Sequence, residues 1–230
     1  MGVDPFRRFT WFFHTDNSNI RAFFDSGKWK RLTASLNTAK LRDLKGYRMG
    51  NNHFLVADAL PDLNHFSLRK VLKEEKAFRA LIDTFELNKV PISDLQNPLE
   101  RIYELDQKLT YAPEEGQLKT NIGNYKRFVW TLLLEPDLVE EYKNAHGIGR
   151  AWPEITNNMK SIGIKDMEIY LYESRAILIM DTFPDFDLEE VGPRWQQLPR
   201  EAEWQAYVAR FQRTDPNSDI EEKWEDMEVL

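Results

Sequence analysis

The chain has 230 residues, 42% of them hydrophobic and 30% charged, a globular balance in a chain long enough to bury a core. Its net charge of −7, with no basic run clear of acidic neighbours, argues against a nucleic-acid partner. The chain has no cysteine, so disulfides, thiolate metal sites and cysteine nucleophiles are excluded. It also lacks a signal-peptide pattern and any apolar run of about 18 residues, so we expect a soluble cytoplasmic protein without membrane contacts.

The first half of the chain predicts a strand, a hairpin and an exposed linker. Aromatic residues alternate along residues 8–14, which indicates a strand with His14 on the opposite face. Gly50-Asn51-Asn52 is typical of a β-hairpin turn. Gly123 and the segment Ala112-Pro113-Glu114-Glu115-Gly116 indicate the linker.

The second half predicts a ferredoxin-like order of strand, helix, hairpin, helix and strand. Apolar residues that recur at every second position indicate the strands, and those that recur every three or four positions indicate the helices. The expected elements are a strand at 127–134, a helix opened by Pro136, a helix opened by Pro153 and capped by Gly163, a hairpin at 167–183 around Glu173-Ser174-Arg175, a helix carrying Trp204, Tyr207, Val208 and Phe211, and a last strand at 224–230. The fold class is therefore α+β.

The two halves resemble each other. Residues 36–62 align with residues 159–185 at a constant offset of 123, without a gap. The identical pairs are Asp43/Asp166, Tyr47/Tyr170, Leu55/Leu178, Asp58/Asp181, Pro61/Pro184 and Asp62/Asp185. Further matches are Arg8-Phe9-x-Trp11 with Arg127-Phe128-x-Trp130 upstream, and Phe78/Trp204 and Phe85/Phe211 downstream. We interpret the chain as a diverged tandem repeat.

The repeat predicts a ferredoxin-like unit at residues 1–106, a linker at 107–124 and a second ferredoxin-like unit at 125–230. Two such units can pack sheet to sheet, which predicts an intrachain dimeric α+β barrel, a pseudo-dimer. We therefore expect a monomer, with higher assembly through another face left open.

The chain has four histidines, and none of them suggests a metal site. No pair has the spacing of a zinc-binding helix, and no HExxH motif occurs. The sequence also lacks a phosphate-binding glycine loop, so we expect neither a metal nor another cofactor. His53, near the hairpin turn, and His65, in a polar loop, are predicted to be solvent-exposed.

His146 is the histidine best placed for chemistry. It follows Tyr142 by four residues on one predicted helix, so both side chains project from the same face. Gly147 and Gly149 end the helix, and the indole of Trp152 follows. Histidine exchanges protons near neutral pH, and seven tryptophans in the chain suit a sugar pocket. The alternative is that His146 only hydrogen-bonds the end of its helix.

Three motifs of the second half occur in order: Tyr142-x-x-x-His146, Ala151-Trp152-Pro153-Glu154-Ile155, and Gly163-x-x-Asp166-Met167-Glu168-Ile169-Tyr170. Together they resemble the L-rhamnose mutarotase family, over residues 125–230. The last motif and Glu222-Lys223-Trp224-x-x-Met227 are similar to the branch associated with L-fucose or L-rhamnose. The resemblance implies a dimeric α+β barrel of ferredoxin-like subunits, in agreement with the elements above.

The resemblance also implies roles for individual residues. His146 corresponds to the catalytic histidine of the family, Tyr142 to its helix tyrosine, and Trp204 to a tryptophan that lines the sugar site. Trp152 is a further candidate for the pocket wall, with a core position as the alternative. Arg150, in a loop that looks two residues longer than in the simplest members, is a predicted substrate contact, with an exposed position as the alternative.

Two departures from the family leave the sugar open. Met167 stands where the rhamnose enzymes have a tyrosine, and Gln205 stands where they have a second consecutive tryptophan. We include Met167 among the predicted substrate-binding residues. Glu168 is its neighbour on a strand, so only one of the two can face the pocket.

The first half lacks the proton-handling pair. At an offset of 119, Phe23 replaces Tyr142 and Gly27 replaces His146. We therefore expect a degenerate unit that serves as a packing partner, and we expect the aspartates shared by both halves to be structural.

The resemblance implies a mutarotase, a carbohydrate isomerase that interconverts the α and β anomers of a deoxy-hexose such as L-rhamnose or L-fucose. One proton must leave the anomeric hydroxyl and one must reach the ring oxygen. We assign this transfer to His146, with Tyr142 as its hydrogen-bonding companion and a monosaccharide as the partner. Two alternatives stay open: a non-catalytic sugar-binding or interaction protein, and a barrel of the monooxygenase or haem-degrading kind, which the fold alone would support.

Overall fold

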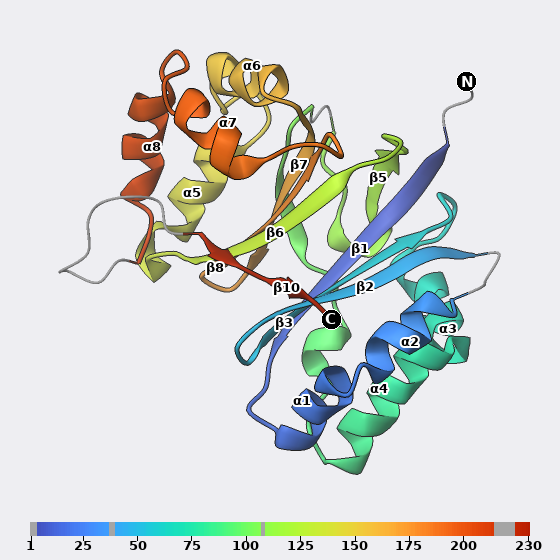
Figure 1. Ribbon diagram of the computed structural model, residues 1–230. Coiled ribbons are helices and arrows are strands. Elements are labelled where there is room, and N and C mark those ends of the chain that lie inside the picture. The colour runs from blue at the N-terminus through green and yellow to red at the C-terminus, as the bar shows by residue number, and fades with distance from the viewer. Residues whose placement is uncertain (1–3, 37–39, 107–108, 214–223) are drawn as a thin grey trace. The chain divides into compact units, whose positions relative to one another are not determined.

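The computed structural model describes residues 4–36, 40–106, 109–213 and 224–230. The chain forms two compact units, each built on a five-stranded sheet with helices on one face (Figure 1). The α+β class and the two ferredoxin-like units in tandem are confirmed. Closure of the two sheets into one barrel stays a prediction.

The sheet of the first unit has the strand order β10-β2-β3-β1-β5. Its elements are the strands β1 (Pro5–His14), β2 (Leu41–Met49), β3 (Asn52–Ala59), β5 (Gln117–Thr120) and β10 (Glu228–Val229), the helices α1 (Ser18–Asp25), α2 (Lys28–Ala34), α3 (His65–Glu74) and α4 (Lys76–Leu87), and the short 3-10 turns Ser93–Leu95 and Pro113–Glu115. The helices bury their apolar sides against the sheet in one aromatic-rich core.

The sheet of the second unit has the corresponding order β4-β7-β8-β6-β9. Its elements are the strands β4 (Glu100–Glu104), β6 (Lys126–Leu133), β7 (Ile164–Tyr172), β8 (Arg175–Thr182) and β9 (Glu225–Asp226), the 3-10 turn Pro136–Leu138, and the helices α5 (Val139–His146), α6 (Pro153–Ser161), α7 (Leu188–Trp195) and α8 (Glu201–Ala209). Gly163, between α6 and β7, has the positive φ of 103° expected of a glycine after a helix. Helix α7 is an element that the sequence patterns did not predict.

Each half of the chain places one strand in the sheet of the other half. β4 precedes the predicted linker and lies beside β7, whereas β10 at the end of the chain pairs with β2. The units are therefore discontinuous: Met1–Glu100, Tyr111–Asn121 and Met227–Leu230 form the first, and Arg101–Thr110 and Ile122–Asp226 form the second. The predicted boundaries treat each unit as one continuous stretch of the chain, and they assign the residues of β5 to a linker. The exchange of strands between the two halves could not be predicted, because pairing between segments far apart in the chain produces no local periodicity.

The two sheets repeat one buried ion pair. In the first unit Arg8 donates two hydrogen bonds of 2.8 Å to Asp58, its partner across β1 and β3. In the second unit Arg127 makes the same double contact with Asp181, at 2.6 Å, across β6 and β8. The two hairpins also carry a β-bulge at aligned positions, Leu41/Asp43 and Ile164/Asp166. The residues shared by both halves thus hold the same place in both sheets.

Two histidines of the first unit are buried. His53 is 0% exposed, and its ring stacks on Phe13 with 4.8 Å between centroids. His65, the first residue of α3, is 8% exposed and lies near Phe9 and Trp11. The prediction that both histidines are solvent-exposed is wrong, because the core extends to the hairpin turn and to the start of α3.

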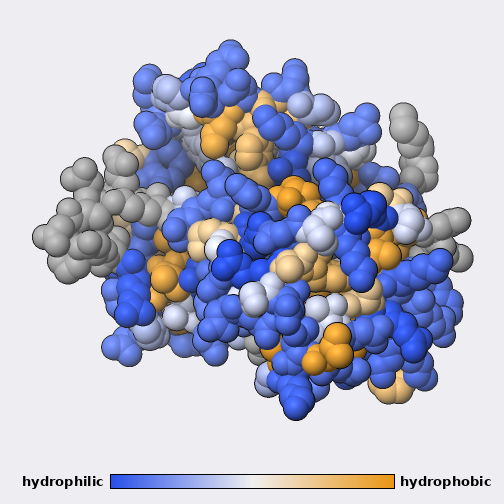
Figure 2. Space-filling model, turned by 60° about the horizontal axis from the view of Figure 1, so that its bottom comes forward, coloured by the Kyte–Doolittle hydropathy of each residue, from blue (hydrophilic) through white to orange (hydrophobic). Residues whose placement is uncertain are grey.

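The exposed large apolar side chains lie in different elements and loops: Phe66, Leu87, Leu109, Leu118, Ile148, Phe183 and Val229. Figure 2 shows a face on which hydrophilic residues predominate and apolar residues form several groups. Scattered apolar exposure of this kind is ordinary for a folded protein. None of the helices in the described residues has the length and apolar character needed to cross a membrane.

Candidate functional site

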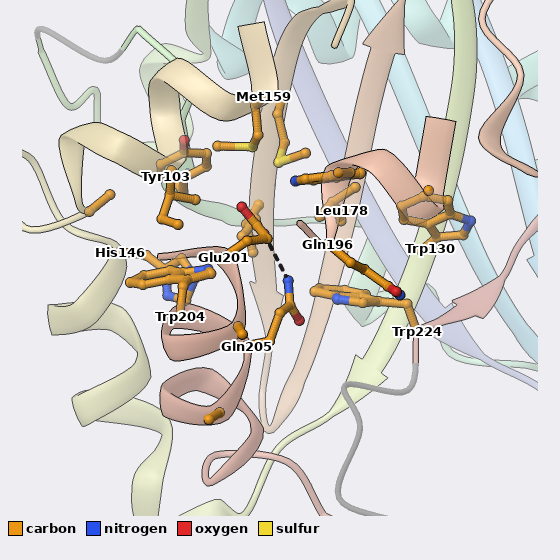
Figure 3. A pocket seen from close by; sticks show the side chains of 18 of the residues that line it. Tyr103, Trp130, His146, Met159, Leu178, Gln196, Glu201, Trp204, Gln205 and Trp224 are labelled. Carbon is orange, nitrogen blue, oxygen red and sulfur yellow. Dashed lines mark hydrogen bonds between the residues drawn. The ribbon is translucent and has the colours of Figure 1, made fainter. Parts of the chain in front are cut away.

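The second unit contains a cavity of about 670 Å³ between its sheet and its four helices. Its floor comes from alternate residues of four strands, which face the helices because side chains of a strand alternate in direction: Tyr103, Trp130, Met167, Ile169 and Leu178. Its walls come from the helices and from Trp224 beside β9. Figure 3 shows His146 beside Trp204 on one wall, Trp130 and Trp224 on the other side, and Glu201 and Gln205 between them.

His146 ends helix α5 and lines the cavity, although only 6% of its surface is exposed. Its Nδ1 lies 2.9 Å from the carbonyl oxygen of Tyr142. A carbonyl oxygen can only accept, so Nδ1 carries the hydrogen and Nε2 carries the lone pair. Burial lowers the pKa of His146 from 6.5 to about 4, and the hydrogen bond to Tyr142 opposes that shift. At neutral pH the ring is therefore uncharged, with Nε2 as an acceptor.

Aromatic rings enclose His146 on three sides. The ring centroids of Tyr142, Trp204 and Tyr103 lie 4.2, 5.4 and 6.0 Å from the His146 centroid. Tyr142 is fully buried, and burial also raises the pKa of Tyr103 above its ordinary value. The phenol of Tyr103 therefore stays protonated at neutral pH.

The structure separates the other predicted binding residues into three positions. Met167 lines the floor of the cavity, and Trp204 on α8 lines one wall. Trp152, which immediately precedes α6, packs on Trp204 with 5.4 Å between ring centroids, and the Arg200 guanidinium lies over the Trp152 ring, 3.9 Å from its centroid. Arg150 is exposed in the loop after α5 and is not among the residues that line the cavity.

Glu168 faces away from the cavity, on the other side of β7. It accepts hydrogen bonds from Arg101 at 3.0 Å and from the Tyr170 hydroxyl at 2.9 Å, and it is 0% exposed. Alternation along the strand therefore directs Met167 to the cavity and Glu168 to a buried ion pair.

Several lining residues were missed by the sequence analysis: Tyr103, Trp195, Gln196 and Glu201. Glu201 precedes Trp204 by three residues on α8, so helical spacing could have placed both on one face. Tyr103 gave no such signal, because it reaches the cavity through β4, which belongs to the first half of the sequence. Trp195 and Gln196 lie at the end of the unpredicted helix α7.

The lining combines an apolar floor with a few uncharged or acidic polar groups. It contains no lysine or arginine among the described residues. In the same part of the chain, no three histidine, aspartate or glutamate side chains are grouped so that they could hold a metal ion. A neutral imidazole, two phenols, a carboxylate and several indoles can bind a small uncharged polyol and move a proton on it.

The chain is similar in sequence to known proteins. The family model for L-rhamnose mutarotase matches residues 127–230. An L-fucose mutarotase of Xanthomonas campestris pv. campestris is 31% identical over 101 residues, which is 43% of this chain and 81% of that protein. A UPF0734 protein of Dictyostelium discoideum is 30% identical over 113 residues, 46% of this chain and 89% of that protein.

Among solved structures, a candidate monooxygenase from Lactobacillus acidophilus NCFM is 10% identical to this chain. The superposition has a TM-score of 0.46 and covers 98% of this chain and 94% of that one.

Proposed function

The chain belongs to the L-rhamnose mutarotase family, and we propose that it interconverts the α and β anomers of a deoxy-hexose such as L-rhamnose or L-fucose. The observation that carries the proposal is the buried, uncharged imidazole of His146 at the wall of a cavity that is large enough for a monosaccharide. The reaction class is that of a carbohydrate isomerase.

In the proposed mechanism, Nε2 of His146 accepts the proton of the anomeric hydroxyl. The bond between C1 and the ring oxygen breaks as the C1 carbonyl forms, and the ring oxygen receives the proton. Rotation about the C1–C2 bond presents the other face of the carbonyl, and the reverse steps close the ring as the other anomer. Because burial lowers the pKa of His146, its protonated ring is more acidic than an ordinary imidazolium and gives up the proton more readily.

The remaining residues bind and orient the sugar in this proposal. The carbonyl of Tyr142 fixes the tautomer of His146, and its phenol packs directly on the imidazole. Trp204 offers an apolar wall for the sugar, and Trp152 packs on Trp204. Met167 lies on the apolar floor, which suits the methyl group of a deoxy-sugar. The exposed position of Arg150 lends no support to its predicted role in substrate binding.

We further propose that the protein works as a monomer, because one chain contains both five-stranded sheets. Sedimentation at micromolar concentration should give the mass of a single chain. An obligate dimer would contradict this part of the proposal.

The proposed activity is tested by exchange NMR on the purified protein with L-rhamnose, L-fucose, D-galactose and D-glucose. We expect faster exchange between the anomeric signals of at least one deoxy-sugar than in a heat-denatured control. Saturation transfer from protein to sugar reports binding in the same samples. Binding of a sugar without faster exchange would favour the sugar-binding alternative and reject the mutarotase.

A further inference from the structure

A buried carboxylate, Glu201, lines the cavity and has no part in the mechanism above. It lies in the first turn of α8 and is 2% exposed. An ionised carboxylate is costly to bury unless hydrogen bonds or charges compensate it. The groups that surround the Glu201 carboxylate therefore indicate which kind of ligand it can bind.

Two neutral amides hold the carboxylate in place. Asn158 Nδ2 donates to Oε2 at 3.1 Å, and Gln205 Nε2 donates to Oε1 at 3.2 Å, as Figure 3 shows for Gln205. Within the part of the chain that the structure describes, no lysine or arginine pairs with Glu201. A carboxylate offers about four acceptor positions, so each oxygen keeps capacity for another donor.

The rest of the cavity supplies no cation for this carboxylate, because lysine and arginine are absent from its described lining. It does supply a donor: the indole N–H of Trp195 is buried at the cavity and has no hydrogen-bond partner among the described residues. Glu201 can accept further hydrogen bonds and the Trp195 indole can donate one. Hydroxyl groups suit both residues, because a hydroxyl group both donates and accepts.

We propose that Glu201 is a substrate-binding residue whose two carboxylate oxygens accept hydrogen bonds from two adjacent ring hydroxyls of an uncharged sugar. This inference rests on the proposed sugar-binding function and adds a specificity rule to it. A carboxylate or phosphate on the sugar would meet a buried negative charge with no compensating cation, so anionic sugars are rejected.

The first test compares Glu201→Gln with Glu203→Gln, two changes only two residues apart on α8. Glu203 is the matched control, because its side chain is 64% exposed and pairs with Arg200 outside the cavity. A hydrogen bond to a charged group contributes enough that its loss should raise KM for L-fucose by about tenfold or more. kcat should change little, since the contact is equally present in ground and transition states. We measure both constants from the dependence of the anomer exchange rate on sugar concentration.

An unchanged KM in Glu201→Gln overturns the inference. A collapse of kcat at constant KM overturns it as well, because Glu201 would then transfer a proton instead of binding hydroxyls. The mutarotase proposal fails separately, if the unaltered protein binds L-fucose without faster exchange. In that case the affinity of the two variants for L-fucose, measured by saturation transfer, still decides the role of Glu201.

The second test needs no variant and so does not depend on the folding of one. D-galactose and D-galacturonate differ at C6, where the second sugar carries a carboxylate. D-galacturonate should displace L-fucose from the unaltered protein at least about tenfold less well than D-galactose, because a desolvated like-charge contact is costly. Displacement by D-galacturonate that equals or exceeds that by D-galactose overturns the inference.

Discussion

The two units have one strand plan and different interiors. In the first unit Trp11 is 0% exposed and packs on Phe78, with 6.3 Å between ring centroids. The aligned residues of the second unit, Trp130 and Trp204, line opposite sides of the cavity. The same strand plan thus supports an aromatic core in one unit and a cavity with polar groups in its walls in the other.

The difference extends to the backbone. His146 is the last residue of helix α5, whereas the aligned Gly27 precedes α2 with a left-handed φ of 65°. A side chain at Gly27 would be strained there, whatever space surrounds it. Phe23, which aligns with Tyr142, packs on Trp29 with 6.2 Å between ring centroids. Restoring the histidine alone would therefore not rebuild the site in the first unit.

The largest expected effect is at His146, in contrast to His53, one of the two buried histidines of the first unit. His146→Asn should lower the anomer exchange rate by about 10²–10⁴, the usual effect of losing one acid/base group. His53→Asn should leave the rate per folded molecule unchanged, because His53 stacks on Phe13 in the first unit. Exchange NMR on both variants checks this contrast. A rate for His146→Asn equal to that of the parent would show that His146 is only a helix-end residue.

Truncation of the first-unit core should affect stability instead of chemistry. Phe23 is 6% exposed, so Phe23→Ala should lower the free energy of unfolding by about 3–5 kcal/mol. The exchange rate per folded molecule should persist at temperatures well below the melting transition. Urea unfolding and exchange NMR measure the two quantities. Unaltered stability with abolished exchange would instead locate a site in the first unit.

Acid should destabilise the fold through the same two histidines. Burial lowers the pKa of both His146 and His53 to about 4, against 6.5 when unfolded. Between these values the unfolded chain binds protons that the folded chain does not. The free energy of unfolding is therefore highest above pH 6.5 and falls toward pH 4, by at most about 1.4 kcal/mol per pH unit for each histidine.

Urea unfolding at pH 7.5 and 5.5 measures this slope, at temperatures and protein concentrations held constant. His53→Asn and His146→Asn should each make it shallower than in the parent. Equal slopes in all three proteins would mean that neither ring is held uncharged by the fold. Because His146 is uncharged down to about pH 4, the exchange rate should also stay level from pH 8 to about pH 5.

The smallest effect is expected at Tyr103, which the first half of the sequence contributes to the second unit. Tyr103→Phe keeps the ring beside His146 and removes only the hydroxyl, so the exchange rate should fall by about tenfold or less. Tyr207→Phe is the control, because Tyr207 lies on α8 outside the cavity lining. If both variants exchange as fast as the parent, Tyr103 only packs.

Much of this architecture was readable from local patterns. Helical spacing places Tyr142 and His146 on one face of a helix. The glycine at 163 separates a helix from a strand, and the turn Gly50-Asn51-Asn52 separates the two strands of a hairpin, as the structure shows. These features depend on residues a few positions apart, whose propensities act before any tertiary contact forms. The aligned Arg8 and Arg127 likewise pointed to equivalent places in two sheets.

Other features depended on contacts between residues far apart in the chain. Placement of β4 beside β7 brings Tyr103 into the cavity, although Tyr103 belongs to the first half of the sequence and nothing in its local pattern indicates the second unit. The choice between Met167 and Glu168 follows from which face of β7 the helices cover, and the burial of His53 follows from where the aromatic core ends. Local periodicity sets the type of each element, whereas strand partners and covered faces are set by long-range packing, which a single sequence does not display.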